Sequence, residues 1–201
     1  MKIAVCIKQV PIVSKIEFDY RNKIIIRQGV PMEMNVFDLI ALGRAVELKE
    51  EFGAQVTVVT MGPPQAKDAL AHALAVGADH AVLVTDRLMA GSDTLATART
   101  LSLALKDKGY DLILCGRNST DAETGQVGPE VAELLGIPHI SRARKLDYLS
   151  DTNDIVVERV TDDGYEIIEC SLPVLVTAAE GLSEERWPRK QVIAEASERP
   201  M

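Results

Sequence analysis

Short apolar runs rich in β-branched residues alternate with longer amphipathic stretches over residues 2–135. The apolar runs predict strands buried on both faces of a parallel sheet, over Lys2 to Ile7, Gln55 to Met61, His80 to Val84 and Asp111 to Cys115. Between them apolar residues recur every three or four positions, which predicts helices over Phe37 to Phe52, Pro64 to Val76, Ser92 to Lys108 and Gly125 to Leu135. This alternation is typical of βαβ units. We therefore expect an α/β fold with a mostly parallel sheet flanked by helices.

The chain departs from this alternation before its first predicted helix. Lys15 to Tyr20 and Lys23 to Arg27 flank the pair Arg21-Asn22, which predicts a β-hairpin. We expect this hairpin to form an insert, over about residues 12–30, between the first strand and the first helix.

A second departure follows Pro138, where strand-like runs succeed one another with no gap long enough for a helix. These runs are Arg144 to Tyr148, Ile155 to Val160, Glu166 to Ser171 and Val174 to Thr177. They predict an antiparallel β extension over about residues 140–178. After Gly181 the chain is charged and aperiodic, so we expect a surface segment or partner contact around Trp187. Residues 1–190 are thus expected to form one domain, followed by an acidic tail over residues 191–201.

Composition narrows the class of protein. Of 201 residues, 22 are Lys or Arg and 30 are Asp or Glu, and the formal net charge of −8 argues against a nucleic-acid partner. Hydrophobic residues make up 47% and aromatic residues 4%, so Val, Ile, Leu and Ala must form most of the core. No apolar run reaches the roughly 18 residues that a membrane helix requires, and the first residues do not resemble a signal peptide. We expect a cytoplasmic protein with no membrane insertion.

The sequence gives little support for catalytic or metal chemistry. Cys6, Cys115 and Cys170 lie far apart in apolar runs, so we expect buried, reduced thiols rather than a metal pair or disulfides. The histidines have no metal-ligand spacing, and no G-x-S-x-G nucleophile motif is present.

The segment Gly116 to Pro129 follows an apolar strand and leads into a helix, and it contains three glycines, three hydroxyl side chains and Arg117. Unpaired backbone N–H groups and a helix dipole favour phosphate, so this segment is a candidate anion cradle. Asp121 and Glu123 would repel phosphate unless they turn outward or bind ribose hydroxyls. An ordinary polar loop with Thr124 as the helix N-cap explains the pattern about equally well.

Three more helix starts at the same edge of the predicted sheet are polar or glycine-rich: Met34 to Asp38, Met61 to Pro64, and Gly91 to Thr97. Helix capping, by Asn35 in the first and by Ser92 or Asp93 in the third, would explain those two. In the second, a proline that starts the next helix is a sufficient explanation. Ligands bind at the carboxyl ends of the strands in an open parallel sheet. So many such segments at one edge favour a nucleotide site, although neither a G-x-G-x-x-G nor a P-loop motif is present.

The order and spacing of several motifs resemble those of the beta subunits of electron transfer flavoproteins. These motifs are Val5-Cys6-Ile7-Lys8-Gln9-Val10-Pro11, Met34-Asn35-Val36-Phe37-Asp38, Met61-Gly62-Pro63-Pro64, Ala75-Val76-Gly77-Ala78-Asp79, the segment from Gly116 to Pro129, and Val176-Thr177-Ala178 through Arg186-Trp187. The resemblance extends from Lys2 to about Lys190.

This resemblance implies a Rossmann-like, adenine nucleotide alpha hydrolase-like fold that binds FAD or AMP. The implied nucleotide contacts are Cys6, Asn35, Val36, Phe37, Asp38, Met61, Asp121, Ala122, Glu123, Thr124, Gly125, Gln126, Val127 and Gly128. It also implies an electron carrier subunit rather than an enzyme, paired with an FAD-bearing alpha subunit. Leu182 would lie at the tip of a loop that docks on acyl-CoA or other dehydrogenases.

The segment Gly91 to Thr97 resembles that of electron-bifurcating members, in which the beta subunit holds a second FAD. Thr94 and Thr97 would then lie near the flavin ring, so the resemblance favours FAD, with AMP as the alternative. The chain departs from the family pattern at Val36, where Pro is usual, and at Trp187, where Tyr is usual. Longer members continue with a C-terminal arm, and here we expect that arm to be truncated or absent. A stand-alone nucleotide-binding sensor or scaffold of the same fold is the competing hypothesis, and an adenylate-transferring enzyme is disfavoured because no S-G-G-x-D loop is present.

Overall fold

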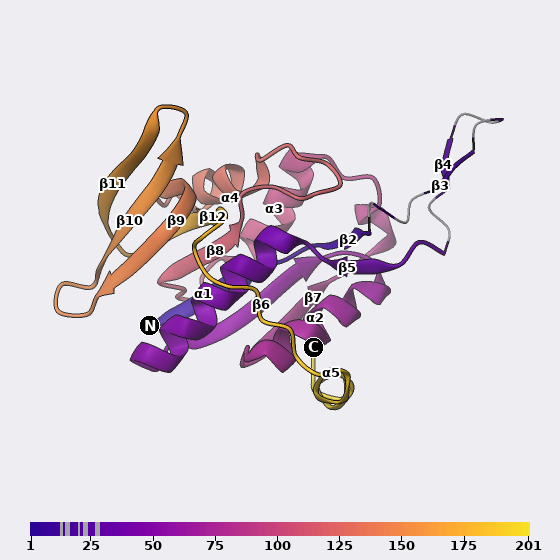
Figure 1. The fold of residues 1–201 in the computed structure, drawn as a ribbon, viewed down its shortest axis with the longest axis horizontal. Coiled ribbons are helices and arrows are strands. Elements are labelled where there is room, and N and C mark those ends of the chain that lie inside the picture. Colours follow the sequence, from indigo (N-terminus) through magenta and orange to yellow (C-terminus); the bar gives the residue numbers. More distant parts are fainter. Residues whose placement is uncertain (13, 15–16, 20, 22–23, 27–28) are drawn as a thin grey trace.

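The fold was analysed in a computed structural model, which describes residues 1–12, 14, 17–19, 21, 24–26 and 29–201. An eight-stranded sheet forms its centre, with helices on both faces (Figure 1). Its order is β11-β10-β9-β12-β8-β1-β6-β7. The strands are β1 (Lys2–Cys6), β6 (Gln55–Met61), β7 (His80–Val84), β8 (Leu112–Gly116), β9 (His139–Leu149), β10 (Asp154–Thr161), β11 (Gly164–Ser171) and β12 (Val174–Ala178). The six strands from β9 to β7 pair in parallel, and β10 and β11 add antiparallel pairs, which confirms the predicted α/β class.

Alternate side chains of the central strands enter two apolar clusters, one on each face of the sheet. Ile3 and Val5 of β1 pack in the cluster that also contains helices α1 (Val36–Phe52) and α2 (Lys67–Val76). Ala4 and Cys6 pack in the other cluster, with α3 (Thr94–Leu105) and α4 (Val127–Leu135). Because successive side chains of a strand point to opposite faces, this division explains why the strands are continuously apolar.

Two of the extension's strands do not pair as the sequence predicted. The run Val174 to Thr177 was expected to be antiparallel, but β12 pairs in parallel with both β8 and β9. Every residue of β12 is buried, which is typical of a central parallel strand rather than of an extension with one solvated face. β9 starts at His139 in parallel with β12 and continues as an antiparallel partner of β10. The antiparallel prediction is therefore correct only for β9 with β10 and for β10 with β11.

The expected hairpin insert is present among the described residues. β3 (Glu17–Asp19) pairs antiparallel with β4 (Ile24–Ile26), and β2 (Gln9–Pro11) pairs with β5 (Met32–Met34) at the base of the insert. The remaining residues of the predicted hairpin strands, 15–16, 20, 23 and 27, and its turn residue 22 lie outside the described residues.

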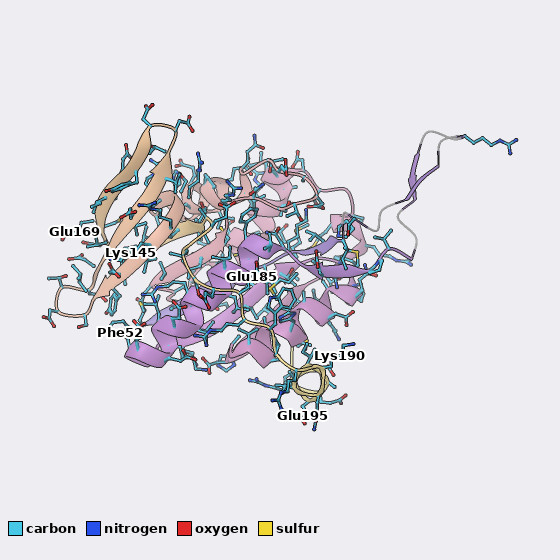
Figure 2. All side chains as sticks on the ribbon, viewed as in Figure 1. Phe52, Lys145, Glu169, Glu185, Lys190 and Glu195 are labelled. Atoms are coloured by element: carbon cyan, nitrogen blue, oxygen red, sulfur yellow. The ribbon has the colours of Figure 1, made fainter. Side chains whose placement is uncertain are left out.

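The sequence suggested that the segment after Gly181 is aperiodic, but the structure contains a helix there. Helix α5 (Lys190–Ser197) packs on α2 and buries Ala196, while Lys190 and Glu195 are exposed to solvent (Figure 2). A single buried position in two turns explains why no helical periodicity was visible. None of the described helices is long and apolar enough to cross a membrane.

Leu114 tests the packing of the sheet because its side chain is fully buried in β8. We expect Leu114→Ala to lower the free energy of unfolding by about 2–5 kcal/mol, through lost apolar burial and the cavity left behind. Leu103→Ala is the matched control, since Leu103 is 72% exposed on α3 and should change the free energy by less than about 0.5 kcal/mol. Urea denaturation of both variants measures this, and equal losses would contradict the assigned core.

Candidate functional site

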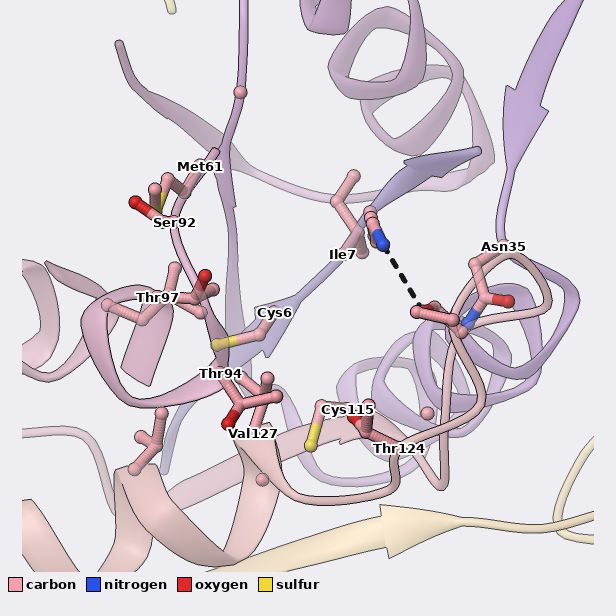
Figure 3. A pocket seen from close by; sticks show the side chains of 18 of the residues that line it. Cys6, Ile7, Asn35, Met61, Ser92, Thr94, Thr97, Cys115, Thr124 and Val127 are labelled. Atoms are coloured by element: carbon pink, nitrogen blue, oxygen red, sulfur yellow. Dashed lines mark hydrogen bonds between the residues drawn. The ribbon is translucent and has the colours of Figure 1, made fainter. Parts of the chain in front are cut away.

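A cavity of about 1300 Å³ lies at the carboxyl ends of the central strands (Figure 3). It is lined by Cys6 of β1, Met61 of β6 and Cys115 of β8, and by residues at the starts of α1, α3 and α4. The chain leaves β1 toward β6 over one face of the sheet and reaches β8 from β7 over the other face. The crevice therefore lies where the strand order reverses, which is the usual ligand position in open α/β sheets.

The carboxylate of Asp38 joins the ends of the two strands that flank this crevice. Its Oδ2 accepts a hydrogen bond of 2.7 Å from the backbone N of Lys8, after β1, and its Oδ1 accepts one of 2.8 Å from the backbone N of Gly116, at the end of β8. Asp38 is 5% exposed, and burial raises its pKa to about 7, against the hydrogen bonds from Gly116 and Lys8, which lower it. A Cβ at position 116 would lie 2.5 Å from the Asp38 Oδ1, so only glycine fits there.

Asn35 holds the polar segment after β8 rather than capping α1. Its backbone takes the N-cap position, but its side chain makes no capping hydrogen bond. Instead its Nδ2 donates to the carbonyl of Asn118 (2.9 Å), and its Oδ1 accepts from the backbone N of Thr120 (3.1 Å). The side-chain capping role predicted for Asn35 is therefore wrong, because this segment competes for the same polar atoms.

The side chain of Asp121 is turned toward Lys8. The Lys8 Nζ donates to both Asp121 carboxylate oxygens, at 2.7 and 2.9 Å, and to the Ser119 hydroxyl at 3.2 Å. Although partial burial raises the pKa of Asp121, the hydrogen bond and charge of Lys8 hold it below the usual value. Asp121 thus carries a neutralised charge, and Glu123 is exposed with a positive φ of 55°. Neither carboxylate lies among the residues that line the cavity.

The residues before and at the start of α4 line the cavity and carry free backbone donors. No acceptor among the described residues receives the N–H groups from Thr124 to Gly128, which precede or begin the helix. The N-cap is Gln126, not Thr124, so the capping alternative for Thr124 is wrong. Gly125 has a φ of +64°, and a Cβ at Gly128 would lie 2.8 Å from the Thr177 methyl group. Free N–H groups at a helix start form an anion site, and these glycines permit the backbone conformation that presents them.

The start of α3 forms the opposite wall of the cavity. The Asp93 side chain accepts a hydrogen bond from the backbone N of Ala96 (2.8 Å), so Asp93 is the N-cap. Thr94 and Thr97 both line the cavity and do not simply face solvent. The Thr94 hydroxyl lies 3.2 Å from the side-chain oxygens of Gln126 and Glu130, which links α3 to α4. Figure 3 shows Ser92, Thr94 and Thr97 on one side of the cavity and Asn35 and Thr124 on the other.

Cys6 and Cys115 form the floor of the cavity as neighbours in register on β1 and β8. Burial raises the pKa of the Cys6 thiol to about 12, with a smaller contribution from the Asp38 charge. Burial also raises the pKa of Cys115, as do the nearby Cys6 and Asp38. Both thiols are therefore protonated near neutral pH and form an apolar wall rather than a nucleophile. Cys170 is a free thiol too, but it is only partly buried, so the prediction of burial is wrong for this residue.

The structure brings most of the predicted site residues together. Those that line the cavity are Cys6, Asn35, Asp38, Met61, Thr94, Thr97, Ala122, Thr124, Gly125, Gln126, Val127 and Gly128. Of the others, Val36 packs against the core, and Phe37 is buried beneath the guanidinium of Arg117, 4.4 Å from its ring. Leu182 is 6% exposed and packs in the main apolar cluster, so it does not form an exposed loop tip in this structure.

Sequence reasoning missed the lining residue Lys8 and five lining residues after β7, which are Thr85, Asp86, Arg87, Met89 and Ala90. Each of these directly follows a parallel strand, and position at the carboxyl end of a strand was the signal available to find them.

The model of the electron transfer flavoprotein domain matches residues 22–200 of the chain. An electron transfer flavoprotein subunit beta from Clostridium acetobutylicum is 46% identical over 187 residues, which cover 93% of this chain and 71% of the relative. The chain belongs to the beta-subunit family of electron transfer flavoproteins. Protein FixA of Azotobacter vinelandii is 44% identical, covering 93% of this chain and 68% of the relative. Subunit CarD of the caffeyl-CoA reductase-Etf complex of Acetobacterium woodii is 40% identical, and the match covers 100% of this chain and 77% of the relative.

Family membership gives the cavity its context. The relatives are named as subunits of electron transfer proteins, which supports a carrier role for this chain.

Asp38→Asn tests the buried carboxylate through pH. Because the pKa of Asp38 is raised in the folded chain, its contribution to the free energy of unfolding is greatest below about pH 4 and is lost as the pH rises through about 7. We expect the stability advantage of the wild type over Asp38→Asn to shrink by on the order of 2 kcal/mol between pH 5 and pH 8. Urea denaturation at both pH values measures it. An advantage that does not change with pH would contradict a raised pKa.

Proposed function

We propose that the cavity binds an adenine nucleotide and that the chain acts as the beta subunit of an electron transfer flavoprotein heterodimer. The observation that carries this proposal is the set of N–H groups from Thr124 to Gly128, which have no acceptor among the described residues and belong to residues that line the cavity. A phosphate or pyrophosphate is the group that such donors recognise. The ion pair between Lys8 and Asp121 removes the charge that would have repelled it.

The residues of the cavity fit a nucleotide from one end to the other. The start of α4 would hold the phosphates. The apolar floor formed by Cys6, Cys115 and Met61 suits a planar aromatic ring, because sulfur atoms make favourable contacts with such rings. Asp38 keeps the two sides of the crevice at a fixed separation because its two oxygens are bonded to different strands. The neutral thiols add no charge beside the ring.

The size of the cavity favours FAD over AMP. Its volume of about 1300 Å³ exceeds the roughly 300–1,000 Å³ of most small-ligand sites. AMP ends at its phosphate and would leave the hydroxyls of Thr94 and Thr97 without a role in ligand binding. A bound flavin supplies one- and two-electron transfer, and the two hydroxyls would orient its ring by hydrogen bonds. In this proposal the heterodimer carries electrons between acyl-CoA or other dehydrogenases and a respiratory or ferredoxin acceptor, by bifurcation where two flavins are present.

Gly125→Val tests the phosphate site. Valine is strained at a φ of +64°, and its Cβ would lie 3.3 Å from the Arg117 carbonyl, so the N–H groups should lose their alignment. We expect the affinity for FAD or AMP to fall at least about tenfold, which is 1.4 kcal/mol, in isothermal titration calorimetry.

Gly136→Val is the matched control for Gly125→Val. Gly136 has a φ of +68° at the opposite end of α4, with no atom within 4 Å of a Cβ. This control should lose stability by a similar amount but keep its nucleotide affinity. Unchanged affinity in Gly125→Val would show that the phosphate binds elsewhere.

The nucleotide itself can be identified in the purified heterodimer. We expect two flavins per heterodimer on denaturation, and we expect Thr94→Val to shift the absorbance spectrum of one of them. Thr100→Val is the control, because the Thr100 hydroxyl donates to the Ala96 carbonyl on the same helix and does not line the cavity. One flavin and one AMP per heterodimer would refute the FAD assignment and leave the carrier function in place.

A further inference from the structure

Two hydroxyl groups on the α3 side of the cavity donate their proton within the protein. A hydroxyl carries one proton, so a proton that is already donated is not available to a ligand. The Ser92 hydroxyl donates to the carbonyl of Met89 (2.8 Å), and the Thr97 hydroxyl donates to the carbonyl of Asp93 (2.7 Å). Both Ser92 and Thr97 line the cavity, and they present lone pairs to a ligand there.

A third hydroxyl, that of Thr94, is in the same state. Its oxygen lies 3.2 Å from Oε1 of Gln126 and 3.2 Å from Oε1 of Glu130, and it donates its proton to this pair of acceptors. An ionised carboxylate accepts hydrogen bonds and donates none, so Glu130 returns no proton to Thr94. Figure 3 shows Ser92, Thr94 and Thr97 on the same side of the cavity. We call their three hydroxyls the acceptor wall.

The opposite side of the cavity carries donors instead. There the N–H groups from Thr124 to Gly128 and the hydroxyl of Thr124 have no acceptor among the described residues. Phosphate oxygens fit this donor side. They do not fit the acceptor wall, because two acceptors form no hydrogen bond with each other. The ligand group at the acceptor wall must therefore carry N–H or O–H donors.

The redox state of a flavin decides how many donors its ring offers. The oxidised ring has one N–H group, at N3, and its N1 and N5 atoms are acceptors. Uptake of two electrons and two protons places a hydrogen on N1 and on N5, which turns both atoms into donors. The three hydroxyls of the acceptor wall therefore match the reduced ring better than the oxidised ring. Hydrogen bonds to ring nitrogens are a means by which proteins tune such a cofactor.

One backbone donor lies beside the acceptor wall. The N–H of Thr94 has no acceptor among the residues that the structure describes. It suits the carbonyl oxygen of the ring that lies between N3 and N5, which is an acceptor in both redox states. This donor therefore helps to hold the ring without favouring either form.

We infer that the acceptor wall makes the cavity bind reduced FAD more tightly than oxidised FAD. This inference rests on the proposed function, because it takes FAD as the nucleotide. Binding that prefers one of two states shifts the equilibrium between them by the difference in affinity. The chain therefore raises the midpoint potential of the FAD that it binds, relative to free FAD.

Spectroelectrochemical titration of FAD bound to the full chain, with free FAD in the same buffer as the reference, measures this preference. We expect reduced FAD to bind at least about tenfold more tightly than oxidised FAD, which is a rise of about 30 mV in the two-electron midpoint potential. Equal affinities for the two forms, or tighter binding of oxidised FAD, would overturn the inference.

Thr94→Val and Thr97→Val test the acceptor wall itself. Each replaces a hydroxyl by a methyl group of similar size and so removes one acceptor. We expect the preference for reduced FAD to fall at least about threefold in each variant, since the reduced ring loses a hydrogen bond that the oxidised ring lacks. Thr100→Val is the matched control, because the Thr100 hydroxyl donates to the Ala96 carbonyl (2.9 Å) on the same helix and does not line the cavity. It should keep the wild-type potential.

The direction of the change separates the acceptor wall from other roles of these hydroxyls. A greater loss of affinity for oxidised FAD than for reduced FAD would show that the hydroxyls donate to the ring, and it would overturn the inference. Equal losses for both forms would also overturn it. They would place the amino group of adenine, which does not change on reduction, at the wall.

The wild-type measurements separate this inference from the proposed function. A chain that binds FAD with no preference for the reduced form contradicts only the inference. A chain that binds AMP but neither form of FAD contradicts the FAD assignment together with the inference. A chain that binds neither nucleotide contradicts the proposed nucleotide site as a whole.

Discussion

The double hydrogen bond to the Asp38 carboxylate is the constraint on which the cavity depends. One oxygen is bonded to the backbone after β1 and the other to the end of β8, so the carboxylate fixes the separation of the two strands that border the crevice. Buried carboxylates are costly, and burial accordingly raises the pKa of this group. The backbone N–H groups of Lys8 and Gly116 offset that cost through their hydrogen bonds to the carboxylate. The same two hydrogen bonds hold the strands on either side of the crevice together.

The rest of the site is held in place through the same region. Asn35 fastens the segment after β8 at two points, and Lys8 fastens it at Asp121 and Ser119. The N–H groups from Thr124 to Gly128, at the start of α4, have no acceptors among the described residues, and these five residues line the cavity. A site arranged in this way needs little rearrangement on binding, which favours affinity for a phosphate ligand.

Much of the fold and of the site could be predicted from the sequence, because continuous apolar runs mark buried parallel strands and polar residues at their carboxyl ends mark the ligand edge. The prediction was wrong where two interactions compete for one residue. Asparagine is a residue type that often caps helices, but the Asn35 side chain binds the segment after β8 instead. The position of β12 between β8 and β9 depends on a pairing that is distant in the sequence, and its short apolar run alone did not reveal it. Leu182 was assigned by resemblance, and its burial depends on tertiary packing.

In the proposed function, the N–H groups from Thr124 to Gly128 bind the phosphates of a nucleotide. Amide NMR spectra of the ¹⁵N-labelled chain, recorded during titration with FAD and separately with AMP, test it most directly. We expect these amide proton resonances to move downfield, because a charge-assisted hydrogen bond to phosphate deshields them, while the amide resonances of β10 and β11 do not shift. Saturable binding that leaves the Thr124 to Gly128 amides unshifted would contradict it.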